Sequence, residues 1–478
     1  MKSSGFRRTF RSGGGALVFN LLSVPIRAVA MILVARSLGV ALFGIYSFAL
    51  EFSFVVSRFA DAGMGIIASR DISRGKEEAS KIFGNLLIIK IFLLLVAFLF
   101  LFLYVIMCTE DTPTQVTIVI LGLANLSFAF MTLLTGVLQA YEKPQIDGFL
   151  MFIQTSLFAF LVVVLAYFMP AQSTPIPMAL CTAISYILIV VIGIWIISRR
   201  YVQPAFCWDS LKIKYLLKEI AHLLFGILAF GLLTRISILM LSALSSEVEV
   251  GAFSAAFRLV FTLGMIPTVI AGVFMPHLSR GTLNSRNAYV HTTTIFFKTL
   301  LIFSAPIVVG FVLHTTNIIE FIYGPQYAGA IVPFAILALG LVPFFLNFCC
   351  KTVLESFGRQ KVWTYLIFAG ACFCIVVNYL CIPTYGANGA AIAFTGALLF
   401  VNSISLLIIR KEIDWKNIIK TVLNVFLSII AMSGCILLLS NWSWVFALIV
   451  GGLSFIMALV LMGEIKIEDV KGTLFSGA

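Results

Sequence analysis

Three arginines lie inside long apolar segments of this sequence: Arg27, Arg235 and Arg258. An arginine at the middle of a membrane helix costs about 2.5–3.5 kcal/mol on insertion scales. We therefore expect these residues to line a hydrated cavity or to pair inside a helix bundle. A guanidinium stays charged at any relevant pH and suits phosphate oxygens, which it binds through two N–H groups at once. The pattern is typical of a transporter with an anionic substrate.

A fourth charge of this kind is the carboxylate of Glu51. An ionisable residue inside a membrane segment is a functional candidate. Glu51 either couples transport to H⁺ or Na⁺, or it is a counter-ion, for instance to Arg258, and we favour the counter-ion. Arg58 and Asp61 follow on the same segment and are expected to pair at its inner boundary.

Three further residues have two interpretations each. Lys90 and Lys298 lie about six or seven residues inside their segments, where a lysine can extend its side chain to water at the membrane surface. Alternatively, both belong to a basic funnel that captures the substrate first. Pro25 would bend its helix just before Arg27 and act as a hinge, and the rival account is tight packing through small residues.

The elements that position these residues are membrane helices. The 478 residues are 61% hydrophobic and 11% charged, whereas an ordinary soluble domain is about 25% charged. A helix needs about twenty apolar residues to cross a bilayer, which predicts an all-α polytopic membrane protein with about fourteen transmembrane helices. Their ranges are near 14–36, 40–61, 83–107, 115–140, 147–169, 177–198, 219–244, 250–276, 292–316, 330–350, 362–382, 387–409, 417–440 and 443–463.

The positive charges predict the orientation. The net charge is +12, and most of the Lys and Arg residues between the segments lie in alternate connections. The other connections hold Arg36 and five acidic residues: Glu110, Asp111, Glu247, Glu249 and Glu320. By the positive-inside rule, both termini are cytoplasmic. Topology explains the basic excess, so no nucleic-acid partner is expected, and the scattered His and Cys residues predict no metal site.

The chain also repeats itself at an offset of about 207 residues. Arg27 precedes Gly44 much as Arg235 precedes Gly251. The repeat predicts two pseudo-symmetric six-helix lobes with a site at their interface. The predicted domains are an N-lobe (1–200), a cytoplasmic amphipathic linker (201–218), a C-lobe (219–410), and helices 13 and 14 with a cytoplasmic tail (411–478).

Short motifs occur in a characteristic order along the chain. They are Ala35-Arg36-Ser37-Leu38-Gly39 with Phe43-Gly44-Ile45-Tyr46, Asp61-Ala62-Gly63-Met64-Gly65, the segment from Gly136 to Lys143, Tyr323-Gly324-Pro325-Gln326-Tyr327-Ala328, and Tyr385-Gly386-Ala387-Asn388-Gly389-Ala390-Ala391. In this order they resemble the polysaccharide flippases of the multidrug/oligosaccharidyl-lipid/polysaccharide exporter superfamily. The resemblance covers nearly all of residues 10–410, and the two additional helices are similar to those of the lipid II flippase branch.

This resemblance implies a flippase, not an enzyme, with no cofactor. It would move an undecaprenyl-pyrophosphate-linked oligosaccharide across the bacterial cytoplasmic (inner) membrane by alternating access, for O-antigen, capsule or related surface polysaccharide. Arg27, Arg235 and Arg258 would clamp the pyrophosphate, and membrane lipid and glycan polymerase or assembly proteins would be partners. One alternative is a multidrug or cation antiporter of the same superfamily, which predicts more acidic residues than Glu51 alone. Another is a membrane-embedded glycan polymerase or transferase, which needs outer catalytic loops, whereas the outer connections here are short.

Overall fold

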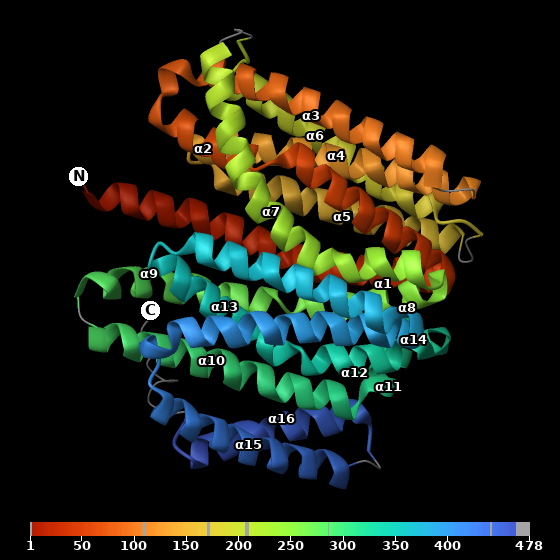
Figure 1. Ribbon diagram of the computed structural model, residues 1–478, viewed down its shortest axis with the longest axis vertical. Helices are drawn as coiled ribbons and strands as arrows, with labels where there is room; N and C mark the ends of the chain where they lie inside the picture. Colours follow the sequence, from red (N-terminus) through yellow and green to blue (C-terminus); the bar gives the residue numbers. More distant parts are fainter. Residues whose placement is uncertain are drawn as a thin grey trace. The chain divides into compact units, whose positions relative to one another are not determined.

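The computed structural model of the chain describes residues 2–108, 111–169, 173–205, 210–284, 286–439 and 442–464. Within these residues, every regular element is helical, which confirms the predicted all-α class. Figure 1 shows the helices in order. The α-helices are α1 (Lys2–Asp61), α2 (Met64–Arg74), α3 (Ala79–Cys108), α4 (Thr112–Ala140), α5 (Pro144–Phe168), α6 (Ile176–Arg200), α7 (Ser210–Leu244), α8 (Glu247–Thr262), α9 (Met265–Asn284), α10 (Arg286–Leu313), α11 (Thr315–Tyr323), α12 (Ile331–Leu339), α13 (Leu341–Ser356), α14 (Gln360–Ile409), α15 (Trp415–Leu438) and α16 (Trp444–Leu461). The short 3₁₀ helices are η1 (Lys76–Glu78), η2 (Pro325–Ala330) and η3 (Arg410–Glu412).

Twelve segments of the described residues are long and apolar enough to cross a membrane. Two of their helices change direction at a glycine: α1 at Gly39 (φ 72°, ψ 174°) and α14 at Gly386 (φ 52°, ψ −127°). Glycine adopts these positive φ angles without a steric penalty because it has no Cβ. Counting α1 and α14 as two helices each gives fourteen, in agreement with the number predicted from the sequence.

Two of the predicted segments are broken in the structure. The segment near 250–276 is divided between α8 and α9, and the one near 330–350 is divided between α12 and α13. In both cases a proline, Pro267 or Pro343, is the third residue of the second helix. Proline is tolerated in a first turn, but it cannot bond to the carbonyl four residues earlier. The breaks therefore fall just before these prolines.

The chain forms two compact units, Met1–Ala255 and Ala256–Ala478. In the first unit, α1 packs against α3, α4, α5 and α7, and α4 packs against α2 and α6. Figure 1 shows α3, α4 and α6 side by side. Helix α7 begins inside the range predicted as a linker, and its Leu216 joins a core with Ile67 of α2 and Leu133 of α4. The lobe boundaries drawn from the repeat stay a prediction.

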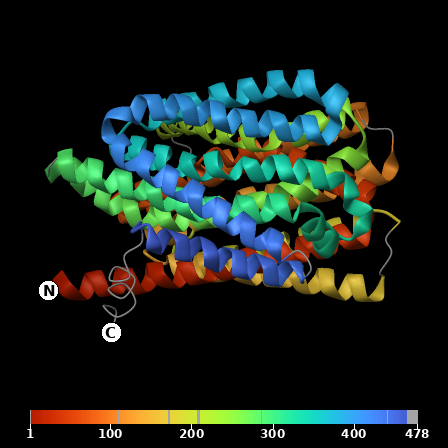
Figure 2. The ribbon, with the colours of Figure 1, turned by 90° about the horizontal axis from the view of Figure 1, so that it is seen from below.

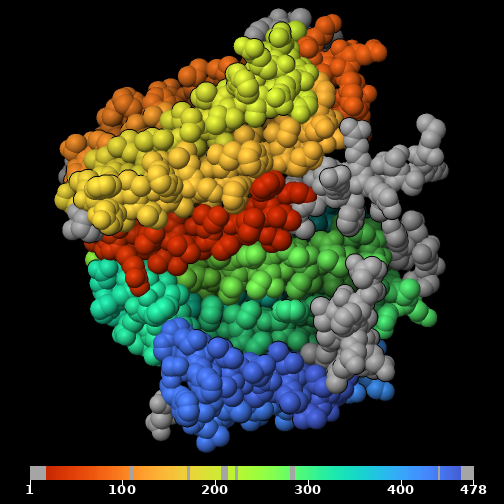
Figure 3. Space-filling model, turned by 180° about the vertical axis from the view of Figure 1, so that it is seen from behind, coloured from red at the N-terminus to blue at the C-terminus, as the bar shows by residue number. Residues whose placement is uncertain are grey.

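In the second unit, α10 packs against α9, α13 and α15, and α13 packs against α14. Helices α15 and α16, the predicted additional pair, lie side by side (Figure 2). They contact α10 through Ala305, Val425 and Phe455. Leu423 and Phe426 of α15 are exposed, and the C-terminal helices form the blue region of Figure 3. Exposed apolar side chains on a helix that can span a bilayer are suited to contact with lipid.

Candidate functional site

Arg27 is exposed on α1 and is held by an uncharged partner. Its Nη2 donates a hydrogen bond of 3.0 Å to Oε1 of Gln154 on α5. Gln154 is only 2% exposed, and its Nε2 donates to Oγ of Ser185 on α6 at 3.1 Å. A guanidinium has five N–H donors, so this contact orients Arg27 while using a single donor. Because glutamine is neutral, the contact does not compensate the charge of Arg27.

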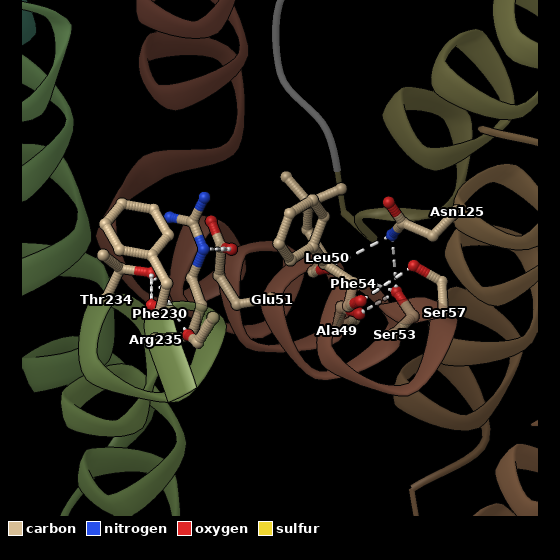
Figure 4. A network of polar contacts seen from close by, with 11 residues as sticks. Ala49, Leu50, Glu51, Ser53, Phe54, Ser57, Asn125, Phe230, Thr234 and Arg235 are labelled. Carbon is tan, nitrogen blue, oxygen red and sulfur yellow. Dashed lines mark hydrogen bonds and ion pairs between the residues drawn. The ribbon is translucent and has the colours of Figure 1, made fainter. Parts of the chain in front are cut away.

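Arg235 of α7 and Glu51 of α1 form a buried ion pair. Nε of Arg235 lies 3.0 Å from Oε2 of Glu51, and Figure 4 shows the two side chains pointing toward each other. Glu51 is 5% exposed. Beside it, Nδ2 of Asn125 on α4 donates to Oγ of Ser53 at 2.8 Å, which anchors this part of α1. The structure therefore shows Arg235 as a partner of Glu51, and the pairing of Glu51 with Arg258 named in the sequence analysis stays a prediction.

Phe54 joins this ion pair to a second one on the same helix. The guanidinium of Arg235 lies 4.9 Å from the centre of the Phe54 ring, and that of Arg58 lies 4.3 Å from it. Nη1 of Arg58 in turn lies 3.0 Å from Oδ2 of Asp61, which confirms the predicted pairing of these two residues. Glu51, Phe54, Arg58 and Asp61 follow the three- and four-residue spacing that places side chains on one face of a helix. The result is a polar stripe along α1.

Lys90 of α3 is buried at the end of this stripe. Its side chain is 0% exposed, and its Nζ lies 3.6 Å from Oδ1 of Asp61. Thr132 of α4 donates a hydrogen bond to the same oxygen. The structure thus contradicts the interpretation in which Lys90 extends to water. Its role in capturing substrate stays a prediction, and it requires the pair with Asp61 to open.

The burial of this pair predicts unequal effects of its two members on stability. Asp61→Asn leaves the Lys90 ammonium without a carboxylate and is expected to lower the free energy of unfolding by about 3–5 kcal/mol. Lys90→Met is expected to cost much less, because Asp61 keeps its contacts with Arg58 and Thr132. Thermal unfolding of both variants and the double variant in detergent is the measurement. Equal losses in the two single variants would contradict the assignment, and the double variant is expected to recover much of the loss.

The two predicted residues of the second unit have partners of their own. Arg258 is half-buried on α8; burial raises the pKa of Tyr323 on α11, and the nearby charge of Arg258 opposes that rise. Nζ of Lys298 on α10 lies 3.6 Å from Oε2 of Glu464, just after α16. Glu464 also accepts a hydrogen bond of 3.0 Å from Thr421 of α15. Lys298 therefore ties α10 to the C-terminal helix pair.

Pro25 is exposed inside α1, and the helix continues through it. The non-helical backbone within α1 is at Gly39 instead. The hinge role of Pro25 stays a prediction.

Helices α1 and α8 cross at two glycines that the sequence repeat had already matched. A Cβ added to Gly44 would lie 2.0 Å from the carbonyl oxygen of Glu247. A Cβ added to Gly251 would lie 2.0 Å from the carbonyl oxygen of Val40. Each glycine thus faces the carbonyl four residues before the other one. This reciprocal contact brings two backbones closer than any residue with a Cβ allows.

The sequence analysis missed three residues that position the charges: Gln154, Phe54 and Ser185. A single amide in the apolar run of α5 was the available signal for Gln154. The regular spacing of Glu51, Phe54 and Arg58 was the signal for the stripe.

A family model described as "Polysaccharide biosynthesis protein" matches residues 11–282. The chain belongs to this family. The family resemblance found in the sequence is thereby confirmed. The matched region contains Arg27, Glu51, Lys90, Arg235 and Arg258, while Lys298 lies beyond it.

Solved structures share the fold of this family member. The lipid II flippase MurJ in an inward closed conformation has a TM-score of 0.79 at 14% identity, covering 94% of this chain and 99% of that one. An inward-facing multidrug resistance MATE family transporter of the MOP superfamily has a TM-score of 0.67 at 16% identity, covering 83% and 97%. Among curated proteins, the uncharacterized membrane protein MJ1068 of Methanocaldococcus jannaschii is 31% identical over 98 residues. That match covers 20% of this chain and about a fifth, 19%, of that protein.

Proposed function

We propose that the protein is a flippase that moves an undecaprenyl-diphosphate-linked oligosaccharide across the bacterial cytoplasmic membrane for surface polysaccharide biosynthesis. The observation that carries this proposal is the guanidinium of Arg27, exposed on an apolar helix and held by the neutral Gln154. Such a charge is costly against lipid, and water or an anion must solvate it. A phosphate group suits it well, because two of its oxygens accept two parallel N–H bonds.

Arg235 supplies a second guanidinium in the same unit. Its ion pair with Glu51 satisfies both charges before substrate arrives. A phosphate can replace the carboxylate, since both present paired oxygens to the guanidinium. In this proposal Glu51 is a counter-ion that pairs with Arg235 again after the substrate is released. Arg258 is a third phosphate ligand. Coupling to H⁺ or Na⁺ through Glu51 is the alternative.

The family and the fold support transport by alternating access. The family description names polysaccharide biosynthesis, and the structure with a TM-score of 0.79 is described as a lipid II flippase. MATE family transporters with a similar fold have been solved in an inward-facing and in an outward-facing conformation. We propose that this chain likewise exposes its site to one side at a time, with both termini cytoplasmic. In this proposal it makes no covalent change in the substrate, which polymerase or assembly proteins then receive.

The membrane potential supplies a direction for the proposed movement. Moving one charge through 100 mV contributes about 2.3 kcal/mol. A diphosphate with two negative charges therefore gains roughly 4–5 kcal/mol when it leaves a negative interior. The empty, positively charged site is driven back by the same field.

Flipping by the purified protein in liposomes tests this function. We expect undecaprenyl diphosphate bearing a short oligosaccharide to cross the bilayer with unchanged mass, faster when the interior is negative. A flux that is independent of the membrane potential but depends on a H⁺ or Na⁺ gradient would favour coupling through Glu51. A change in substrate mass would indicate an enzyme, and export of an organic cation alone would indicate the antiporter. Either of the last two results contradicts the proposal.

A further inference from the structure

We propose that a pocket beside Gly44 of α1 binds a sugar ring of the substrate. The pocket has a volume of about 270 Å³ and lies within the first unit, between α1, α3, α4, α7 and α8. It has an aromatic wall, Phe48 and Tyr104, and a polar one, Thr114, Ser242 and Glu247. The inference rests on the proposed function, because it places the carbohydrate part of the same substrate.

Both aromatic rings of the pocket are fixed from behind by Phe52. The ring centre of Phe48 lies 5.7 Å from that of Phe52 in a stacked arrangement, and the ring of Tyr104 lies 4.2 Å from it. Phe48 and Tyr104 are half-buried, so each ring keeps an accessible part. A rigid aromatic surface of this kind suits the flat C–H face of a sugar ring.

The polar wall can bond to sugar hydroxyls in both directions. Thr114 lies in the first turn of α4, where its Oγ1 donates to Asp111 at 2.7 Å and leaves oxygen lone pairs to accept. Ser242 adds a hydroxyl from α7, and Glu247 adds an exposed carboxylate from the start of α8. Hydroxyls both donate and accept, as the hydroxyls of a sugar do, while a carboxylate only accepts. This mixture fits a neutral polyol better than an organic cation, because a cation has no lone pair that can accept a hydrogen bond from the hydroxyls of the pocket.

The pocket lies close to the proposed phosphate site along α1. Phe48 precedes Glu51 by three residues on α1, which corresponds to a rise of about 4.5 Å along a helix. Glu51 contacts Arg235 directly. In a lipid-linked oligosaccharide the diphosphate is bonded directly to the first sugar. A ring against Phe48 and a phosphate at Arg235 can therefore belong to one substrate molecule.

The test compares two lipids that differ only in the sugar. Native mass spectrometry of the full-length protein in nanodiscs gives its affinity for undecaprenyl diphosphate and for the same lipid carrying one N-acetylglucosamine. We expect the wild type to prefer the sugar-bearing lipid by about tenfold, from one aromatic contact and one or two hydrogen bonds. Phe48→Leu and the milder Ser242→Ala are each expected to cut that preference to about threefold or less and to leave the affinity for undecaprenyl diphosphate unchanged.

Phe59→Leu is the matched control, because Phe59 is on α1 but is 48% exposed and is not part of the pocket. It should keep the full preference. If both pocket variants keep it, the sugar site is wrong. A wild type that binds both lipids equally also overturns the sugar site, but leaves the proposed function standing. A wild type that does not bind undecaprenyl diphosphate overturns the proposed function and this inference with it.

Discussion

Arg27→Ala is expected to reduce flipping about a hundredfold, because it removes a charge-assisted contact with the phosphate. A net loss of about 2.7 kcal/mol, within the range of about 1.5–3 kcal/mol for a hydrogen bond to a charged group, corresponds to this factor. Gln154 and Ser185 remain to bond to each other, so the variant should fold. Arg27→Lys keeps the charge but loses the planar guanidinium that binds two phosphate oxygens at once, so its flipping rate should be intermediate. Initial rates in liposomes, normalised to protein abundance, measure the effect.

Gln154→Glu is a sharper version of the same prediction. It places a carboxylate against the guanidinium of Arg27 at the 3.0 Å contact that the amide now makes. The fold should tolerate this nearly isosteric change, but the charge of Arg27 would be compensated, and the flipping rate should fall about tenfold or more. Arg199→Ala, at an exposed arginine in the last turn of α6, is the control and should leave the flipping rate unchanged. Full activity in both Arg27→Ala and Gln154→Glu would show that Arg27 is not part of the phosphate site.

Gly44→Ala is expected to separate α1 from α8, since its new Cβ would lie 2.0 Å from a backbone oxygen that cannot rotate away. Overpacking of this kind costs about 1–3 kcal/mol. The conformation in which α1 and α8 contact each other at Gly44 and Gly251 would therefore become the less populated one, and flipping should fall at least tenfold. Ser47, one turn further along α1, is 0% exposed. Labelling of Ser47→Cys by a membrane-impermeant thiol reagent should increase when Gly44→Ala is added.

Two variants accompany this prediction. Gly251→Ala should act in the same way, and the double variant should be little worse than either single one, because one separation relieves both contacts. Gly231→Ala, where a Cβ meets nothing within 4 Å, should leave flipping and labelling unchanged. Normal transport in Gly44→Ala would show that the crossing does not limit the cycle.

The helices and the charges could be predicted from the sequence because each depends on short stretches of chain. Apolar length alone predicted the fourteen segments, and the cost of placing Arg27, Arg235 and Glu51 inside a bilayer identified them as candidates. The breaks before Pro267 and Pro343 also had a local signal, the prolines themselves, which the apolar pattern concealed because Ile266 and Val342 beside them are strongly apolar.

The choice of partners could not be predicted, because it depends on how distant segments pack. Arg27 and Gln154 are separated by 127 residues in sequence, and an amide in an apolar helix has several equivalent uses. The ion pair of Glu51 with Arg235 depends on the packing of α1 on α7, which lie far apart in the sequence. A lysine can extend its side chain to water only where no other helix covers it. Lys90 is fully buried beside Asp61, with α1 and α4 packed around it.

The central claim is that the guanidiniums of Arg27 and Arg235, on α1 and α7, bind the diphosphate of a lipid. The most direct measurement is the affinity of the protein in nanodiscs for undecaprenyl diphosphate relative to undecaprenol, which lacks the charged group. We predict a preference of at least about a hundredfold for the diphosphate in the wild type, about a tenfold loss in Arg27→Ala and in Arg235→Ala, and no preference in the double variant. A double variant that still prefers the diphosphate as strongly as the wild type would contradict the account.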